Sequence, residues 1–128
     1  GDDGRPLKGH ADELIISAEQ VGDELLVIAT GEGQATHWGQ FTRLAHVVIN
    51  LVDGSVKGTV VFTAANGDQL FADIDGVPTG SPSTVGGTYT FTGGTGRFNG
   101  ASGTAEFVGV IASDGIHITV AFEGTIQY

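Results

Sequence analysis

Apolar and polar residues alternate along much of the chain, most clearly near its C-terminal end. From Ile116 to Glu123 every second residue is Ile, Val or Phe, and the residues between them are His, Thr, Ala and Glu. Tyr89 and Phe91 alternate with threonines in the same way. A two-residue period is that of a β-strand with one face against a core and the other toward water. The pattern therefore predicts half-buried strands.

Segments rich in Val, Ile, Thr and Phe are interrupted by Gly, Asn, Asp or Pro about every ten residues, which is typical of an all-β sandwich or barrel. Eight strands are expected, approximately at Leu7–Ala18, Glu24–Gly31, Gly39–Leu51, Val56–Ala64, Asp68–Asp75, Gly87–Thr92, Gly103–Ala112 and Gly115–Gln127. Asn66–Gly67 predicts a type I′ hairpin turn with positive φ at both residues. Residues 75–87 are expected to form a long polar loop, and no linker divides residues 1–128, so one domain is expected.

Two of these segments are apolar on both faces. They are ELLVIAT, beginning at Glu24, and AHVVINL, ending at Leu51. A strand of this kind needs cover on its outer side as well as a core on its inner side. We therefore expect a homo-oligomer that buries Leu26, Ile28 or their neighbours.

The stretch FTGGTGRFNGASGTAEF, residues 91–107, is dense in glycine and poses a choice between a phosphate-binding loop and a barrel corner. The spacing does not fit G-x-G-x-x-G, the Gly-Lys-Ser/Thr end of a P-loop is missing, and the following residues alternate like a strand rather than a helix. The corner is the better interpretation. It predicts positive φ at Gly94 and Gly96, with Phe98 plugging the barrel end and Arg97 at the rim.

The same residues carry a family resemblance. TGGTGRFNGASGTAEF resembles the signature of the allene oxide cyclase and dirigent-protein barrels, and the likeness extends loosely over Val56–Tyr128. ATHWGQFT, residues 35–42, resembles a Thr-His-x-Gly-x-Phe-Thr element of small secreted bacterial proteins with the same glycine-rich signature. The resemblance implies a closed eight-stranded antiparallel β-barrel, often oligomeric, whose lumen holds a hydrophobic small molecule and guides its cyclisation or coupling. No catalytic residue of either family has a counterpart here that a motif supports.

Charge and composition narrow the possible partners. Fifteen acidic and five basic residues give a net charge of −10, which disfavours nucleic acid and anionic lipid surfaces. No apolar run approaches the roughly 20 residues of a membrane-spanning helix. The charged start GDDGRPLKGH favours a processed secreted or periplasmic protein slightly over a cytoplasmic one.

Candidate polar chemistry is sparse. The four histidines, His10, His37, His46 and His117, lack the short spacings of a zinc site, so no metal or other cofactor is expected. Glu106 and Glu123 lie on the polar faces of strands that could be neighbours, and they could form a carboxylate pair for acid–base chemistry. Outward-facing, solvated carboxylates are the more ordinary interpretation.

The interior of the expected barrel supplies the candidate site. Eight inward-facing residues are predicted, namely Val60, Phe62, Leu70, Tyr89, Phe91, Ile118, Val120 and Phe122. Ala72, Ala105 and Gly109 leave room among them for an open apolar pocket. Trp38, with Phe41 and Arg43, could form an aromatic and cationic rim at the mouth; the favoured alternative is that Trp38 closes the barrel as a buried plug. The predicted ligand-binding residues are Trp38, Phe41, Phe62, Tyr89 and Phe91.

Two principal functions remain open at this level. The first is a cofactor-independent isomerase or cyclase that orients a hydrophobic, polyunsaturated substrate in the lumen. The second is a non-catalytic secreted binding protein for lipophilic or aromatic ligands. A structural surface protein assembled through its apolar outer faces is a third, weaker possibility.

Overall fold

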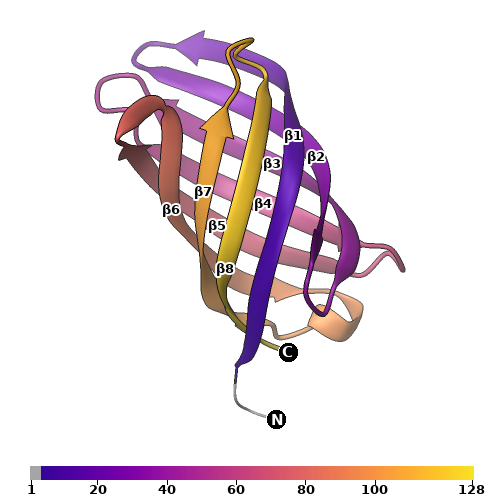
Figure 1. Ribbon diagram of the computed structural model, residues 1–128. Coiled ribbons are helices and arrows are strands. Elements are labelled where there is room, and N and C mark those ends of the chain that lie inside the picture. Colours follow the sequence, from indigo (N-terminus) through magenta and orange to yellow (C-terminus); the bar gives the residue numbers. More distant parts are fainter. Residues whose placement is uncertain (1–3) are drawn as a thin grey trace.

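Eight antiparallel strands close into a barrel in the computed structural model, which describes residues 4–128 apart from the side chain of Pro82 (Figure 1). Each strand pairs with its neighbours in the sequence, and the first pairs with the last. The strands are β1 (Arg5–Val21), β2 (Glu24–Ala35), β3 (Gly39–Asn50), β4 (Val56–Ala64), β5 (Gln69–Thr79), β6 (Ser81–Gly94), β7 (Ser102–Ile111) and β8 (His117–Gln127). The predicted fold class is confirmed. No helix in the described part of the chain is long and apolar enough to cross a membrane.

The apolar residues of the alternating pattern face the lumen of the barrel, and the polar residues between them face the outer surface. Opposed residues of neighbouring strands face the same side, as Phe107 of β7 and Phe122 of β8 both do toward the core. Of the eight residues predicted to face inward, seven are buried and Ile118 is half-buried against the core. The interior positions were therefore correctly predicted.

The expected polar loop at residues 75–87 is wrong. These residues form the ends of β5 and β6, which continue as a hairpin to a turn at Gly80, where φ is 71°. Gly87 sits so close to β5 that a Cβ atom there would lie 2.0 Å from the carbonyl oxygen of Asp75. Gly87 therefore reflects close contact between strands, Gly80 reflects the turn, and the polar residues Asp75, Thr79, Ser81 and Ser83 are exposed to water.

Two details of the turns also differ from expectation. Gly67 has a φ of 92°, but Asn66 does not have a positive φ, so the turn is not type I′. Asn66 instead uses its side chain, whose Oδ1 accepts a hydrogen bond of 3.0 Å from the backbone N–H of Asp68. At the glycine-rich corner Gly96 has a φ of 56°, as predicted, whereas Gly94 does not adopt a positive φ. Gly94 allows the backbone of β6 to approach Phe98 closely, because a Cβ atom at position 94 would lie 2.6 Å from Cβ of Phe98.

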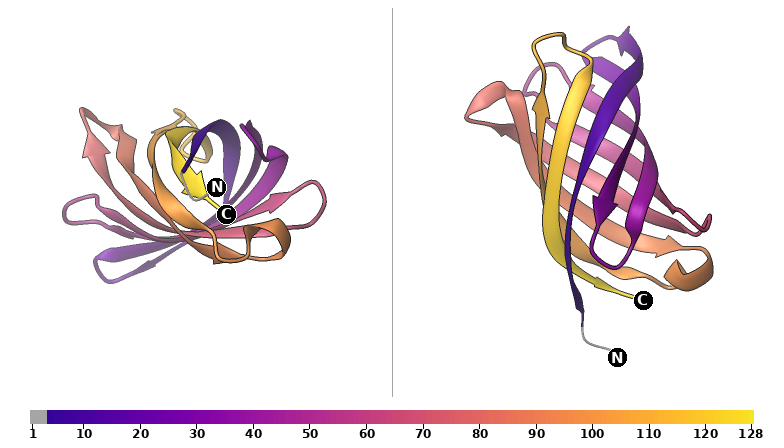
Figure 2. Two further views of the ribbon diagram at one scale, coloured as in Figure 1. Left: turned by 90° about the horizontal axis from the view of Figure 1, so that it is seen from below. Right: turned by 45° about the vertical axis from the view of Figure 1, so that its right-hand side comes forward.

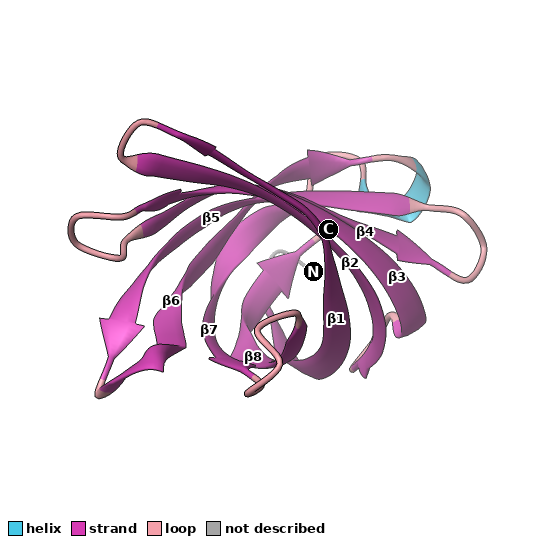
Figure 3. Ribbon diagram, turned by 90° about the horizontal axis from the view of Figure 1, so that it is seen from above, coloured by secondary structure: helices cyan, strands magenta, loops and turns pink. Residues whose placement is uncertain are grey.

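The two ends of the barrel are built differently (Figures 2 and 3). We call the end that carries both chain termini and the connections 36–38, 65–68 and 95–101 the plug end. The end that carries the connections 22–23, 51–55, 80 and 112–116 is the open end. The plug end contains a short 3₁₀ helix, η1 (Gly96–Phe98), and its Phe98 is buried as predicted.

An aromatic cluster fills the lumen on the side of the plug end. Its members are Trp38, Phe41, Phe62, Phe91, Phe98 and Phe122. The ring of Trp38 lies within 5.3–6.1 Å of all five phenylalanine rings, measured between centroids. Such contacts, mostly edge-to-face or tilted, pack well in a core. This half of the barrel is therefore filled by side chains, and any internal site must lie toward the open end.

Candidate functional site in the open half of the lumen

A cavity of about 100 Å³ lies in the lumen on the side of the open end. All of its lining residues are apolar except Glu13, Arg43 and Tyr89. Gly109 of β7 is part of the lining and adds to the space, because a Cβ atom there would meet its nearest neighbour only at 3.7 Å. The expectation that Gly109 leaves room for an apolar pocket is thus confirmed.

The cavity opens toward solvent between the ends of the strands. Tyr89 and Ile74, at its inner end, are buried. Ile15, Val47 and Ile118, which lie nearer the open end, are only half-buried although they face the lumen. Apolar side chains that line a lumen but retain contact with water mark an accessible mouth.

Three polar side chains meet at the inner end of the cavity and come from three different strands. Glu13 is on β1, Arg43 on β3 and Tyr89 on β6, and their exposed fractions are 7%, 4% and 1%. Nε of Arg43 lies 2.7 Å from Oε1 of Glu13. Nη1 of Arg43 donates a hydrogen bond of 2.8 Å to the hydroxyl oxygen of Tyr89. We refer to these three residues as the polar triad.

Backbone register brings the triad together. Gly31 of β2 lies opposite Glu13 on one side and opposite Arg43 on the other. A Cβ atom at Gly31 would lie 2.9 Å from Cγ of Glu13, so any side chain there would occupy the space through which the two charges meet. The guanidinium carbon of Arg43 also lies 5.3 Å from the ring centroid of Phe62 and 5.6 Å from that of Tyr89, close enough for cation–π attraction.

Burial changes the acid–base properties of the triad. Removal from water raises the pKa of Glu13 above its ordinary value, and the positive charge of Arg43 opposes this effect in part. Burial likewise raises the pKa of Tyr89, so its hydroxyl keeps its proton across the physiological range. The inner end of the cavity thus combines a carboxyl group that retains a proton more readily than usual with a neutral phenol and a guanidinium.

Of the five residues predicted to bind a ligand, Tyr89 lines the cavity. Trp38, Phe41, Phe62 and Phe91 are buried together in the aromatic cluster, outside the cavity lining. Phe62 connects the two regions, since its ring contacts Tyr89 at 5.8 Å between centroids. Their role in ligand binding stays a prediction.

Burial decides between the two positions considered for Trp38 and corrects the position expected for Arg43. Trp38 is 5% exposed and closes the barrel as a plug rather than forming the mouth. The expectation that Arg43 lies on the rim is wrong, because Arg43 occupies an inward position of β3, between Phe41 and Ala45. Its charge is accommodated there by Glu13 and Tyr89.

Sequence reasoning missed Glu13 and the polar triad. The signal was available in the alternation, since Ala11, Glu13 and Ile15 share one parity on β1, and Phe41, Arg43 and Ala45 share one parity on β3. An acidic and a basic residue at inward positions of two strands indicate a buried ion pair. Only the register across β2 shows that the two residues meet.

The other carboxylate pair lies on the outer surface. Glu106 and Glu123 are directly opposite one another on β7 and β8, and both are exposed. The ordinary interpretation, outward-facing solvated carboxylates, is confirmed. Within residues 4–128 no three metal-ligating side chains are grouped so that they could hold an ion.

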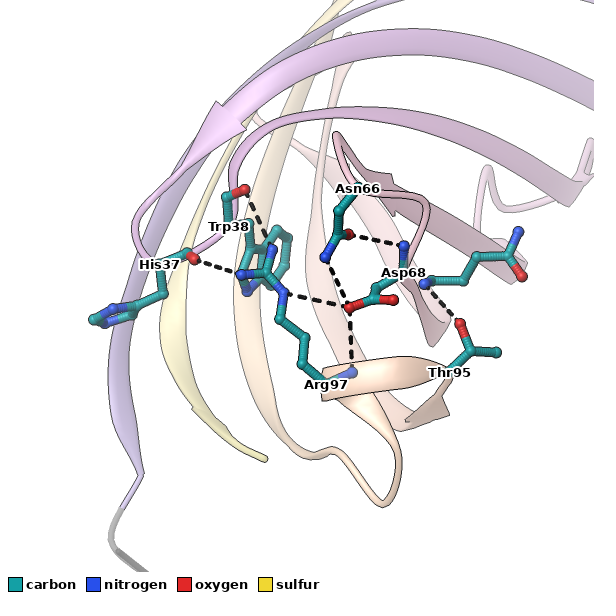
Figure 4. A network of polar contacts seen from close by, with 7 residues as sticks. His37, Trp38, Asn66, Asp68, Thr95 and Arg97 are labelled. Carbon is teal, nitrogen blue, oxygen red and sulfur yellow. Dashed lines mark hydrogen bonds and ion pairs between the residues drawn. The ribbon is translucent and has the colours of Figure 1, made fainter.

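A polar network closes the plug end (Figure 4). Arg97 of η1 donates hydrogen bonds to the backbone oxygens of His37 (3.4 Å) and Trp38 (3.5 Å), and its Nε lies 4.0 Å from Oδ2 of Asp68. The backbone N–H of Arg97 donates to the same carboxylate oxygen at 3.2 Å. Arg97 therefore lies at the rim, as predicted, and ties together the β2–β3, β4–β5 and β6–β7 connections around the Trp38 plug.

Comparison with known proteins supports the fold. No protein-family model matches the chain, and no curated protein sequence matches it. Among solved structures, the pterocarpan synthase dirigent protein GePTS1 matches with a TM-score of 0.60 and 13% sequence identity, over 98% of this chain and 91% of that chain. The protein therefore has the closed eight-stranded barrel of the dirigent proteins. The likeness to small secreted bacterial proteins stays a prediction.

Proposed function

We propose that this protein binds a hydrophobic small molecule in the open half of its lumen. The observation that carries the proposal is the apolar cavity of about 100 Å³, reached from the open end and closed at its inner end by the polar triad. A largely apolar pocket with a few convergent polar groups is the usual form of a small-molecule site.

The size of the cavity defines how a ligand would sit. A volume on the order of 100 Å³ is comparable to that of cavities that accept a single benzene-sized ring. A larger ligand would place one end beside the triad and extend between the half-buried side chains of Ile15, Val47 and Ile118 at the mouth. The likeness to a dirigent protein structure supports the barrel fold within which this mode of binding is proposed.

Gly109 offers a direct test of this binding mode. Valine at position 109 suits a β-strand and would fill cavity space, whereas Gly109→Ala adds only one methyl group without a close contact. A panel of lipophilic and aromatic compounds should bind the native protein saturably in calorimetry or native mass spectrometry. Gly109→Val should weaken binding about tenfold or more, and Gly109→Ala should weaken it less. Binding that is unchanged in Gly109→Val would place the ligand elsewhere and contradict the proposal.

A second candidate function is isomerisation or cyclisation of the bound molecule. It is favoured by Glu13, a carboxyl group with a raised pKa that lines the cavity and could exchange a proton with a ligand. The matching dirigent structure is described as a pterocarpan synthase, which makes an enzymatic role for this fold reasonable to test. Glu13→Gln should abolish turnover of a converted ligand while retaining its binding. A ligand that is bound but never converted by the native protein would favour the non-catalytic binding protein.

A further inference from the structure

The polar triad contains hydrogen-bond donors that the protein does not use. The hydroxyl oxygen of Tyr89 accepts a hydrogen bond from Nη1 of Arg43, so its own hydrogen must point elsewhere. Within residues 4–128, no acceptor is found for that hydrogen, and Nη2 of Arg43 makes no hydrogen bond. Both residues line the cavity. A buried donor without an acceptor is costly, and an oxygen atom of a ligand could relieve the cost.

These donors are close enough to serve one atom. Nη1 of Arg43 and the hydroxyl oxygen of Tyr89 are 2.8 Å apart, so an oxygen placed beside them could accept from Tyr89 and from a guanidinium N–H together. Oε1 of Glu13 is paired by charge with Nε of Arg43 at 2.7 Å, although neither of these two buried atoms has a hydrogen-bond partner among the described residues. The inner end of the cavity therefore offers unused donors and no free positive charge.

Charge balance decides what kind of oxygen fits. Glu13 and Arg43 are the charged residues among those that line the cavity, and they neutralise each other. A carboxylate ligand would bring a second negative charge beside one guanidinium in a site with little water, unless Glu13 first took up a proton. A neutral carbonyl oxygen accepts the same hydrogen bonds without that penalty.

We propose that the ligand is a lipophilic molecule with a neutral carbonyl group, of the ketone, enone or quinone class, whose oxygen accepts hydrogen bonds from Tyr89 and Arg43. The inference rests on the proposed function, because it requires the ligand to occupy the open half of the lumen. It goes further by assigning recognition of the carbonyl to two named donors and by excluding lipophilic carboxylates at pH values where Glu13 is ionised.

Three probes that share one apolar body test the inference on the native protein at pH 8. They are 2-acetylnaphthalene, which has the carbonyl; 2-ethylnaphthalene, which lacks it; and 2-naphthoate, which carries a charge. Calorimetric titration should show the ketone binding about tenfold tighter than the hydrocarbon, the effect of about one net hydrogen bond. The carboxylate should bind more weakly than the ketone.

Tyr89→Phe is the matched variant, because it keeps the aromatic ring that stacks on Phe107, at 4.6 Å between centroids, and removes the donor. It should lower the advantage of the ketone over the hydrocarbon and leave the affinity for the hydrocarbon within about twofold of the native value. The comparison of probes on the native protein decides the question even if this variant does not fold.

The outcomes separate the two proposals. Equal affinity for ketone and hydrocarbon, or strongest binding of the carboxylate, would overturn the carbonyl assignment and leave the binding function intact. Unchanged selectivity in Tyr89→Phe would overturn the role of Tyr89. If none of the probes binds the native protein and a broad lipophile panel also fails, the proposed function is contradicted and this inference with it.

Discussion

Glu13 of β1 and Arg43 of β3 meet across an intervening strand, with Nε and Oε1 2.7 Å apart. They can do so because the residue between them on β2 is Gly31. Glu13, Gly31 and Arg43, which are far apart in the sequence, thus form one structural unit. The absence of a side chain at Gly31 is as important for the ion pair as the two charged groups.

Substitution of Gly31 should disturb this unit directly. In Gly31→Ala the added Cβ atom would lie 2.3 Å from the carbonyl oxygen of Asp12 and 2.9 Å from Cγ of Glu13, so the backbone or Glu13 must move. We expect a loss of about 1–3 kcal/mol in the free energy of unfolding, measured in urea. Gly109→Ala is the control, because its Cβ atom makes only ordinary contacts, and it should change stability much less.

Removal of one partner of the ion pair should cost more than removal of both. Arg43→Met leaves Glu13 buried without its cation and should destabilise the fold by about 3–5 kcal/mol at neutral pH. The double variant with Glu13→Gln should recover a substantial part of that loss, since neither charge remains. Denaturant unfolding of the native protein, Arg43→Met, Glu13→Gln and the double variant gives the coupling energy between the two residues. If the effects of the two single substitutions simply add, the pair is not coupled.

Glu13 should also change how the free energy of unfolding depends on pH. Its pKa in the folded protein is raised above the ordinary value of 4.5, so the folded state binds this proton more tightly than the unfolded state does. The contribution of Glu13 to stability is therefore greatest at low pH and declines as pH rises from about 4.5 through the raised pKa. The difference in unfolding free energy between the native protein and Glu13→Gln should fall over that range and then level off. A difference that increases with pH there would show the shift to have the opposite sign.

The glycine-rich corner should be intolerant of a side chain at Gly96. This residue has a φ of 56°, and a Cβ atom would lie 2.1 Å from Oδ1 of Asp68. Gly96→Val should lower the free energy of unfolding by about 1–3 kcal/mol. A melting temperature equal to that of the native protein would mean that the corner adjusts freely.

The expected homo-oligomer stays a prediction, and the outer surface indicates where to test it. Leu26 of β2 and Leu44 of β3 are each 41% exposed and face away from the lumen. If copies associate through this face, light scattering will show more than one subunit for the native protein and a monomer for Leu26→Glu. A native protein that is monomeric at micromolar concentration would contradict the prediction.

The sequence predicted the strands well because the two-residue period is local and strong. Tyr89, Phe91, Val120 and Phe122 could be assigned to the lumen from their own strands alone. The same reasoning failed at residues 75–87, where the tip of the β5–β6 hairpin, residues 77–81, is exposed and glycines occupy positions 76, 86 and 87, so that no apolar alternation marks the segment.

The site was harder to predict for a different reason. The meeting of Glu13 with Arg43 depends on the register of β1, β2 and β3 together, including the bulge between Ile15 and Ser17 on β1. No single strand carries that information. Trp38 could be placed as a plug by its size, but that it fills only one half of the barrel depends on the side chains of five phenylalanines.

The Trp38 plug and the Arg97 network close the lumen at the plug end, so that it is accessible only from the open end. A molecule bound there must enter and leave by the same route, so the end that goes in first is the end that meets Arg43 and Tyr89. Compounds with polar groups at both ends are accommodated only if the second group reaches back to the mouth. The end of the molecule that enters the lumen first therefore determines the orientation of the bound molecule, before the other end makes any contact with the protein.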